Sequence, residues 1–96
     1  MARGNAKTIQ EAIAAMMSKY GLAERYRKVS VLASWEKLMG KTIASRTERV
    51  YIRERKLYIR LTSAALRQEL SYAKDKILHL VNQEAGQVIV DEVIIQ

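Results

Sequence analysis

The sequence predicts an α+β fold, a single compact domain in which a three-stranded sheet carries its helices on one face. Residues 49–62 alternate apolar and polar side chains on both sides of a short turn, which indicates a β-hairpin. Residues 5–20, 22–39 and 64–84 repeat apolar side chains at spacings of three and four, as amphipathic helices do. A β-branched run at 87–96 then predicts a third strand. The element order is therefore α-α-β-β-α-β, with helices on the apolar face of the sheet and the other face toward solvent.

Length and composition limit the protein to one domain and exclude several classes. Its 96 residues, 49% of them apolar, can bury one modest core, so we expect a single domain over residues 1–96 with residues 1–4 frayed. No apolar stretch reaches the ~20 residues of a membrane span or resembles a signal peptide, so we expect no membrane partner. The absence of cysteine excludes disulfides and thiolate metal sites and favours the cytoplasm. The net charge of +7 favours nucleic acid or an acidic protein as partner.

The first helix is predicted to begin near a capping-box spacing, Thr8 to Glu11, with Asn5 as an alternative cap, and to end at Gly21. Its apolar stripe has spacings of four, three and four: Ile9, Ile13, Met16 and Tyr20. We interpret this stripe as part of the core. The alternative is a soft binding groove, since Met16 and Met17 supply flexible thioethers.

The second helix is predicted over residues 22–39, ending at Gly40. Its core face can hold the following residues: Tyr26, Val29, Leu32 or Ala33, and Leu38 or Met39. Trp35 is interpreted as a core anchor, because aliphatic residues flank it; the alternative is a platform on which a base stacks. Residues 41–47 form a connector, either a helical turn or the start of a strand.

The hairpin at 49–62 has one register that separates its two kinds of side chain. If Ile52 faces Leu57 across a loop centred on Glu54 and Arg55, every apolar residue lies on one face of the sheet. A slip of one residue would bury arginine and tyrosine together with isoleucine, so that register is excluded.

The second face of this hairpin is basic and aromatic. Its residues form three cross-strand pairs, Arg49 with Arg60, Tyr51 with Tyr58, and Arg53 with Lys56. Like charges directly opposite each other destabilise the sheet by about a few tenths of a kcal/mol per pair, so stability alone would not select this face. It suits a polyanion or an acidic protein surface. The alternative is a solvated face whose cations only prevent aggregation of the sheet.

A third helix is predicted from Ala64 to about Glu84, capped by Thr62 or Ser63 and ended by Gly86. Its stripe consists of Leu66, Leu70, Ala73, Ile77 and Leu80 or Val81. In the last strand the core side holds Ile89, Val93 and Ile95. A charged residue, Asp91, shares their parity, which predicts a bulge or a late start of the strand near Asp91 and Glu92.

No pattern of residues indicates catalysis, a cofactor or a metal site. His79 is the only histidine and has Asp75 four residues before it, which is a possible surface pair but not a set of metal ligands. The adjacent carboxylates Asp91 and Glu92 would point to opposite faces of a strand. No motif activates a serine or threonine as a nucleophile, and the glycines fall at helix ends instead of in a phosphate-binding loop. We therefore expect a non-enzymatic protein.

With these elements in order, the sequence resembles the DciA-like domain family over about residues 22–96. The residues that carry the resemblance are Trp35, Met39-Gly40, Ile43-Ala44, Thr47, Leu57-Tyr58-Ile59, Thr62-Ser63, Glu69-Leu70, Val81-Asn82 and the closing Val-Ile strand. The resemblance implies a KH-like domain that binds DNA, associates with the replicative helicase and assists its loading during DNA replication.

The sequence lacks the GxxG loop with which KH domains clamp a nucleic-acid backbone, so contacts should come from the sheet face or from loops. The candidate nucleic-acid-binding residues are Arg49, Tyr51, Arg53, Lys56, Tyr58 and Arg60. The cations would contact phosphates and the tyrosines would stack on bases or pack against sugars, with little sequence specificity. DNA and RNA both stay open as ligands. The alternative function is an adaptor whose basic face docks on an acidic protein without a nucleic-acid role.

Overall fold

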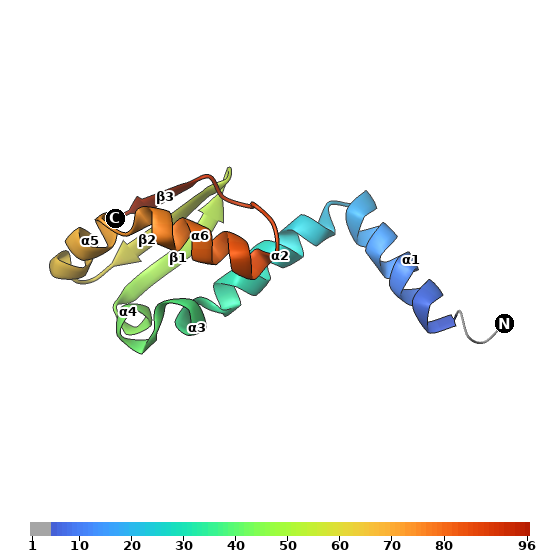
Figure 1. Ribbon diagram of the computed structural model, residues 1–96, viewed down its shortest axis with the longest axis horizontal. Helices are drawn as coiled ribbons and strands as arrows, with labels where there is room; N and C mark the ends of the chain where they lie inside the picture. The colour runs from blue at the N-terminus through green and yellow to red at the C-terminus, as the bar shows by residue number, and fades with distance from the viewer. Residues whose placement is uncertain (1–4) are drawn as a thin grey trace.

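The computed structural model describes residues 5–96, so the predicted fraying of residues 1–4 lies outside the described part of the chain. The helices are α1 (Asn5–Lys19), α2 (Leu22–Ala33), α3 (Trp35–Met39), α4 (Lys41–Ser45), α5 (Ala64–Ser71) and α6 (Lys74–Ala85). The strands are β1 (Thr47–Arg53), β2 (Lys56–Leu61) and β3 (Glu92–Ile95). The predicted α+β class and the order of the main elements are confirmed (Figure 1).

The sheet has the strand order β1-β2-β3, with β1 and β2 antiparallel and β2 and β3 parallel. The predicted hairpin register is confirmed, because Ile52 pairs with Leu57 and Tyr51 pairs with Tyr58. The last strand begins only at Glu92, which confirms the predicted late start. The parallel pairing follows from the α5–α6 connection, which crosses over one face of the sheet and brings the chain back along the edge of β2 that lies opposite β1.

The core lies between one face of this sheet and the helices. The strands contribute Leu57, Ile59, Leu61 and Val93, the helices contribute Val31, Trp35, Leu70, Ile77 and Val81, and the loop before β3 contributes Ile89 and Val90. The helices thus cover a single face, as predicted. The finer description of the fold as KH-like stays a prediction, as does the single domain over residues 1–96.

Trp35 is a core anchor, with 5% of its surface exposed, so the alternative of a base-stacking platform is wrong. The indole N–H donates to the Thr47 hydroxyl at 3.1 Å, and this hydroxyl donates to the carbonyl of Ile43 at 2.7 Å. The predicted continuous helix over 22–39 is wrong at this point, because the helix is interrupted at Ser34 and α3 begins at Trp35. Val31 before the interruption and Trp35 after it are both buried in the core.

One further predicted helix is interrupted, while the predictions for the segments around it are confirmed. The helix predicted over 64–84 is interrupted at Tyr72 and Ala73, so that α5 packs against β2 and β3 while α6 packs against α2 and β3. Ser63 caps α5, as predicted, by accepting from the Leu66 N–H at 3.3 Å. In the connector at 41–47, the alternative of a helical turn is confirmed by α4.

The first helix does not pack as predicted. In Figure 1, α1 (blue) stands apart from the sheet and meets the rest of the molecule at α2. Its stripe is exposed: Ile9 by 59%, Ile13 by 53%, Met16 by 56% and Tyr20 by 66%. The radius of gyration is 16.6 Å, against roughly 12–13 Å for a compact chain of this length. The interpretation of the stripe as core was wrong, because helical spacing reports amphipathicity and not what covers the apolar face.

The predicted core face of the second helix is wrong in part for the same reason. Tyr26 and Val29 are exposed by 64% and 60%, and Val31, which was not in the predicted set, is fully buried. The first turns of α2 extend past the sheet toward α1, so only the end of α2 lies over the core (Figure 1). Within residues 5–96 no helix combines the length and the apolar composition needed to cross a membrane.

The exposure of α1 gives a stability prediction. Replacing Ile13 and Met16 by glutamine, which propagates a helix as well as methionine does, should change the free energy of unfolding by less than about 0.5 kcal/mol. The core substitution Leu57→Ala should cost about 2–5 kcal/mol. Urea unfolding followed by Trp35 fluorescence measures both. A loss for the α1 variant as large as that for Leu57→Ala would contradict the exposed position of the stripe.

Candidate nucleic-acid interface

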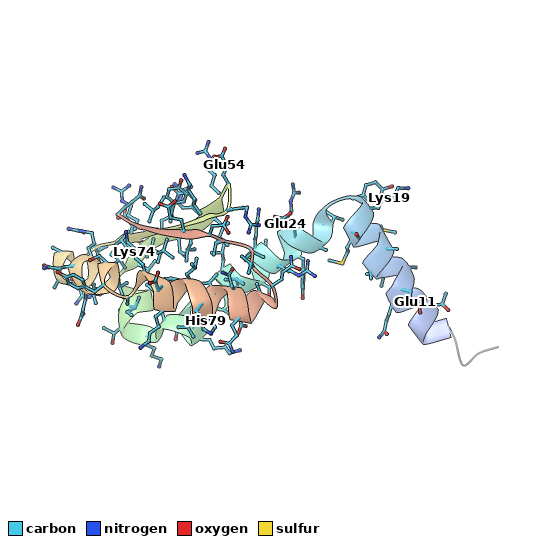
Figure 2. The ribbon with its side chains drawn as sticks, turned by 45° about the horizontal axis from the view of Figure 1, so that its top comes forward. Glu11, Lys19, Glu24, Glu54, Lys74 and His79 are labelled. Atoms are coloured by element: carbon cyan, nitrogen blue, oxygen red, sulfur yellow. The ribbon has the colours of Figure 1, made fainter. Side chains whose placement is uncertain are left out.

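The hairpin brings all six candidate residues to the sheet face that the helices leave uncovered. Because side chains alternate along a strand, the β1 residues Arg49, Tyr51 and Arg53 share this face with the β2 residues Lys56, Tyr58 and Arg60. We call these six residues the basic tyrosine face. The three arginines are exposed, while Lys56 and the tyrosines are half-buried. Figure 2 shows many side chains projecting from this side of the sheet, with Glu54 at the hairpin tip.

The two tyrosines stack on each other across the strands. The ring centroids of Tyr51 and Tyr58 are 4.8 Å apart and the ring planes are 7° from parallel. The guanidinium carbon of Arg49 lies 4.5 Å from the centroid of Tyr51. This contact is a cation–π interaction, which stabilises the pair by roughly 0.5–1 kcal/mol at an exposed site. The face is therefore a pre-arranged stack and not a set of independent side chains.

A bulge at the start of β1 adds an acidic residue that the sequence analysis missed. The pairing shifts between Thr47 and Arg49, so Glu48 has no partner of its own on β2. A Glu48 carboxylate oxygen lies 3.3 Å from Nε of Arg60. This ion pair offsets the predicted repulsion between Arg49 and Arg60. The sequence held one sign of this irregularity. Glu48 is charged although it stands two residues before Val50, at a position that strict alternation would make apolar.

The third strand contributes two more residues to the same face, which sequence reasoning also missed. In the parallel register Glu92 pairs with Lys56, and Ile94 pairs with Tyr58. The face is therefore basic along β1 and more neutral toward β3. The sequence shows the alternation within 92–95 but not its register against β2, so it could not place these residues.

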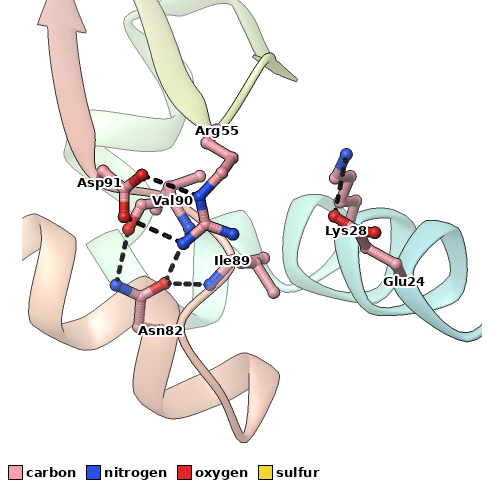
Figure 3. Close-up of polar contacts among 7 residues, drawn as sticks. All are labelled: Glu24, Lys28, Arg55, Asn82, Ile89, Val90 and Asp91. Atoms are coloured by element: carbon pink, nitrogen blue, oxygen red, sulfur yellow. Dashed lines mark hydrogen bonds and ion pairs between the residues drawn. The ribbon is translucent and has the colours of Figure 1, made fainter.

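The hairpin turn is held in an unusual conformation by the loop before β3. Glu54 and Arg55 have φ values of 50° and 63°, a left-handed pair that normally favours asparagine and glycine. Arg55 donates from Nε to Oδ2 of Asp91 at 2.7 Å and from Nη2 to Oδ1 at 2.9 Å. The N–H of Asp91 in turn donates to the carbonyl of Arg55 at 2.8 Å; Figure 3 draws the two side-chain contacts. This reciprocal contact fixes the turn relative to β3, and with it the end of the basic tyrosine face.

The loop before β3 is itself held by Asn82 on α6. The Asn82 carbonyl oxygen accepts from the N–H groups of Ile89 and Val90 at 2.9 and 3.1 Å, and its amide donates to the carbonyl of Val90 at 3.0 Å. These contacts are drawn in Figure 3. Through this loop, α6 positions Asp91 opposite Arg55.

The Arg55–Asp91 contact makes part of the stability depend on pH. Hydrogen bonding from Arg55 lowers the pKa of the Asp91 carboxyl, so the contribution is present above the carboxyl's ordinary pKa and is lost as the pH falls through the lowered pKa. We expect the difference in unfolding free energy between the wild type and Asp91→Asn to be constant near neutral pH and to shrink below about pH 4. Urea titrations across this range measure it. A difference that is the same at every pH would contradict the contact.

Within residues 5–96, no group of three or more histidine, cysteine or carboxylate side chains lies close enough to hold a metal ion. His79 and Asp75 are both exposed on α6, and Figure 2 shows His79 on the helix side of the molecule, away from the sheet.

The chain was compared with protein families, with curated proteins and with solved structures. The family model described as "Dna[CI] antecedent, DciA" matches residues 8–95. No curated protein and no solved structure matches. The match covers nearly the whole described chain and includes the hairpin with its basic tyrosine face. The chain therefore belongs to the DciA family, whose members are associated with the loading of the replicative helicase in DNA replication.

Proposed function

We propose that the protein is a non-enzymatic, nucleic-acid-binding accessory of the cytoplasm that assists replicative helicase loading, with DNA as its ligand. The basic tyrosine face carries this proposal. It places four cations around two aromatic rings on the one sheet face without helices. Phosphate contacts supply most of the affinity of sequence-independent nucleic-acid binding.

Low sequence specificity follows from the chemistry of this face. Base edges are read most often by the bidentate contacts of arginine to guanine and of asparagine or glutamine to adenine. The basic tyrosine face has no amide side chain, and Arg49 and Arg60 already contact Tyr51 and Glu48. We therefore expect contacts to phosphates, which position the protein on DNA without selecting a sequence.

The test is a fluorescence-anisotropy titration of labelled single- and double-stranded DNA at about 50 and 200 mM salt. A surface that contacts three phosphates should show a slope of log K against log salt near −2 to −3, so affinity should fall roughly 15- to 65-fold over this range. No binding to either form at the lower salt concentration would overturn the proposal.

A second candidate function is that of a protein adaptor, in which the basic face docks on an acidic patch of the helicase. The exposed apolar residues of α1 and α2 favour a protein contact, since apolar surface of this kind is typical of interaction sites. A pull-down with purified replicative helicase after nuclease treatment tests it. Capture that is lost with Arg53→Glu and Arg60→Glu supports docking through the sheet, and loss only with Ile13→Gln and Met16→Gln supports docking through α1.

A further inference from the structure

The stacked arrangement of the tyrosines limits what the basic tyrosine face can bind. A base stacks on an aromatic side chain only where one face of the ring is open. One face of Tyr51 is covered by Tyr58, at 4.8 Å between centroids, and the guanidinium of Arg49, 4.5 Å from the centroid, occupies the other. Tyr51 therefore has no ring face to offer to a base.

Tyr58 is limited in a similar way. Tyr51 lies on its β1 side, so its second ring face points toward β3. There its cross-strand neighbour is Ile94, and both residues are half-buried. From β1 to β3 the side chains therefore follow one another as Arg49, Tyr51, Tyr58 and Ile94. What this row presents to solvent is ring edges and hydroxyl groups, flanked by the cations of Arg53, Lys56 and Arg60.

We infer that this surface binds the sugar–phosphate backbone and not the bases, and that it therefore takes double-stranded DNA at least as tightly as single-stranded DNA. The inference rests on the proposed function and specifies its ligand. Tyrosine hydroxyls and exposed cations both donate hydrogen bonds to phosphate oxygens. A duplex carries one negative charge per about 1.7 Å of its axis, a higher density than a single strand, so a backbone-binding surface favours it. The two tyrosines act as a rigid support for the cations and do not stack on nucleobases.

Two measurements test this inference. The first replaces one adenine of a single-stranded probe by 2-aminopurine, whose fluorescence changes when it stacks on an aromatic ring, and uses the unmodified protein. The position of the analogue is moved along the strand, so that every base is sampled. We expect the anisotropy to report binding while the intrinsic fluorescence of the analogue stays as in the free strand at every position.

The second measurement compares Tyr58→Leu with Tyr58→Phe against a duplex and a single strand of equal length. Loss of a ring that stacks a base would weaken single-strand binding about fivefold or more. On a backbone-binding surface each variant loses only the hydrogen bond of one hydroxyl to phosphate, so each should weaken both DNA forms by the same factor, and Tyr58→Leu should bind within about threefold of Tyr58→Phe. Tyr58→Phe keeps the ring stack and serves as the control for folding.

The outcomes separate this inference from the proposed function. A strong change in analogue fluorescence, or a selective loss of single-strand affinity in Tyr58→Leu, would overturn the inference and leave the nucleic-acid function intact. Single-strand binding that is tighter than duplex binding would also overturn it. No binding of the wild type to either form at low salt would overturn the proposed function and this inference with it.

Discussion

Reversal of two charges on the basic tyrosine face, Arg53→Glu with Arg60→Glu, is expected to weaken DNA binding by about 30- to 150-fold at low salt. Each charge reversal, counting the lost phosphate contact and the new repulsion together, contributes roughly 1–1.5 kcal/mol, and 1.4 kcal/mol is a factor of ten. The slope of log K against log salt should fall by about two, since two counterion-releasing contacts are lost. Anisotropy titrations at several salt concentrations measure both quantities.

The matched control is Lys74→Glu with Lys76→Glu. Both lysines are exposed on α6, on the helix side of the molecule, and this variant changes the net charge by the same amount. If only the total charge mattered, the two double variants would bind DNA equally. We expect the α6 variant to lose less than about threefold, because its charges lie on the helix side of the molecule and the effect of exposed charges is screened over a Debye length of about 10 Å at 0.1 M salt. Equal losses of affinity in the two double variants would show that the basic tyrosine face is not the DNA-binding surface.

The Glu48–Arg60 ion pair allows the opposite experiment. Glu48→Gln removes the carboxylate that lies 3.3 Å from Arg60, which leaves the guanidinium available to a phosphate. The contact of Arg60 with phosphate then no longer competes with Glu48, so this variant should bind DNA severalfold more tightly, with a salt slope that differs from that of the wild type by less than one. In the double reversal, Arg60→Glu both removes a cation and places a second carboxylate beside Glu48. Glu48→Gln changes the charge at this place without removing Arg60, so it tests the contribution of the cation separately.

The second large effect concerns stability. Asn82→Ala is expected to lower the free energy of unfolding by about 2–4 kcal/mol, because it leaves the N–H groups of Ile89 and Val90 without their acceptor. Both residues are buried, at 1% and 0% exposure, so water cannot readily replace the lost partner. A domain of this size has a total stability of roughly 5–14 kcal/mol, so the loss is a large fraction of it. Urea unfolding monitored by circular dichroism measures it.

Two controls identify the cause of that loss. Gln83→Ala changes the neighbouring, exposed position of α6 and should cost less than about 0.5 kcal/mol. Asn82→Asp retains an acceptor for both N–H groups but loses the donor to the Val90 carbonyl, 3.0 Å away, and should show an intermediate stability. If Asn82→Ala were no worse than Gln83→Ala, the loop before β3 would not depend on this side chain.

The hairpin shows which structural features a local sequence pattern can predict. Strict alternation through Val50 and Ile52, and through Leu57 and Ile59, determined the strands, their register and the two faces. A slip of one residue would have exchanged the faces, and the cost of burying arginine excluded it. All six candidate residues were therefore placed on one face from sequence alone, although their role in binding stays a prediction.

The contacts made across longer separations in the chain could not be predicted in this way. The sequence does not show that Glu48 would sit in a bulge beside Arg60, or that Asp91 would pair with Arg55, 36 residues away. It also could not show that Arg49 would cover Tyr51, because alternation fixes the side on which a residue lies and not the rotamer that it adopts.

The sequence by itself determined the elements, the α+β class, the hairpin register and the basic character of one sheet face. Each of these follows from periodicity along a short segment, because interactions between residues close in the sequence determine it. Only the tertiary structure decided that α1 is exposed, that the helices are interrupted at Ser34 and at Tyr72–Ala73, and that β3 joins the sheet beside β2. These features depend on which apolar surfaces meet, and burial is a property of pairs of elements distant in the chain, which no single segment records.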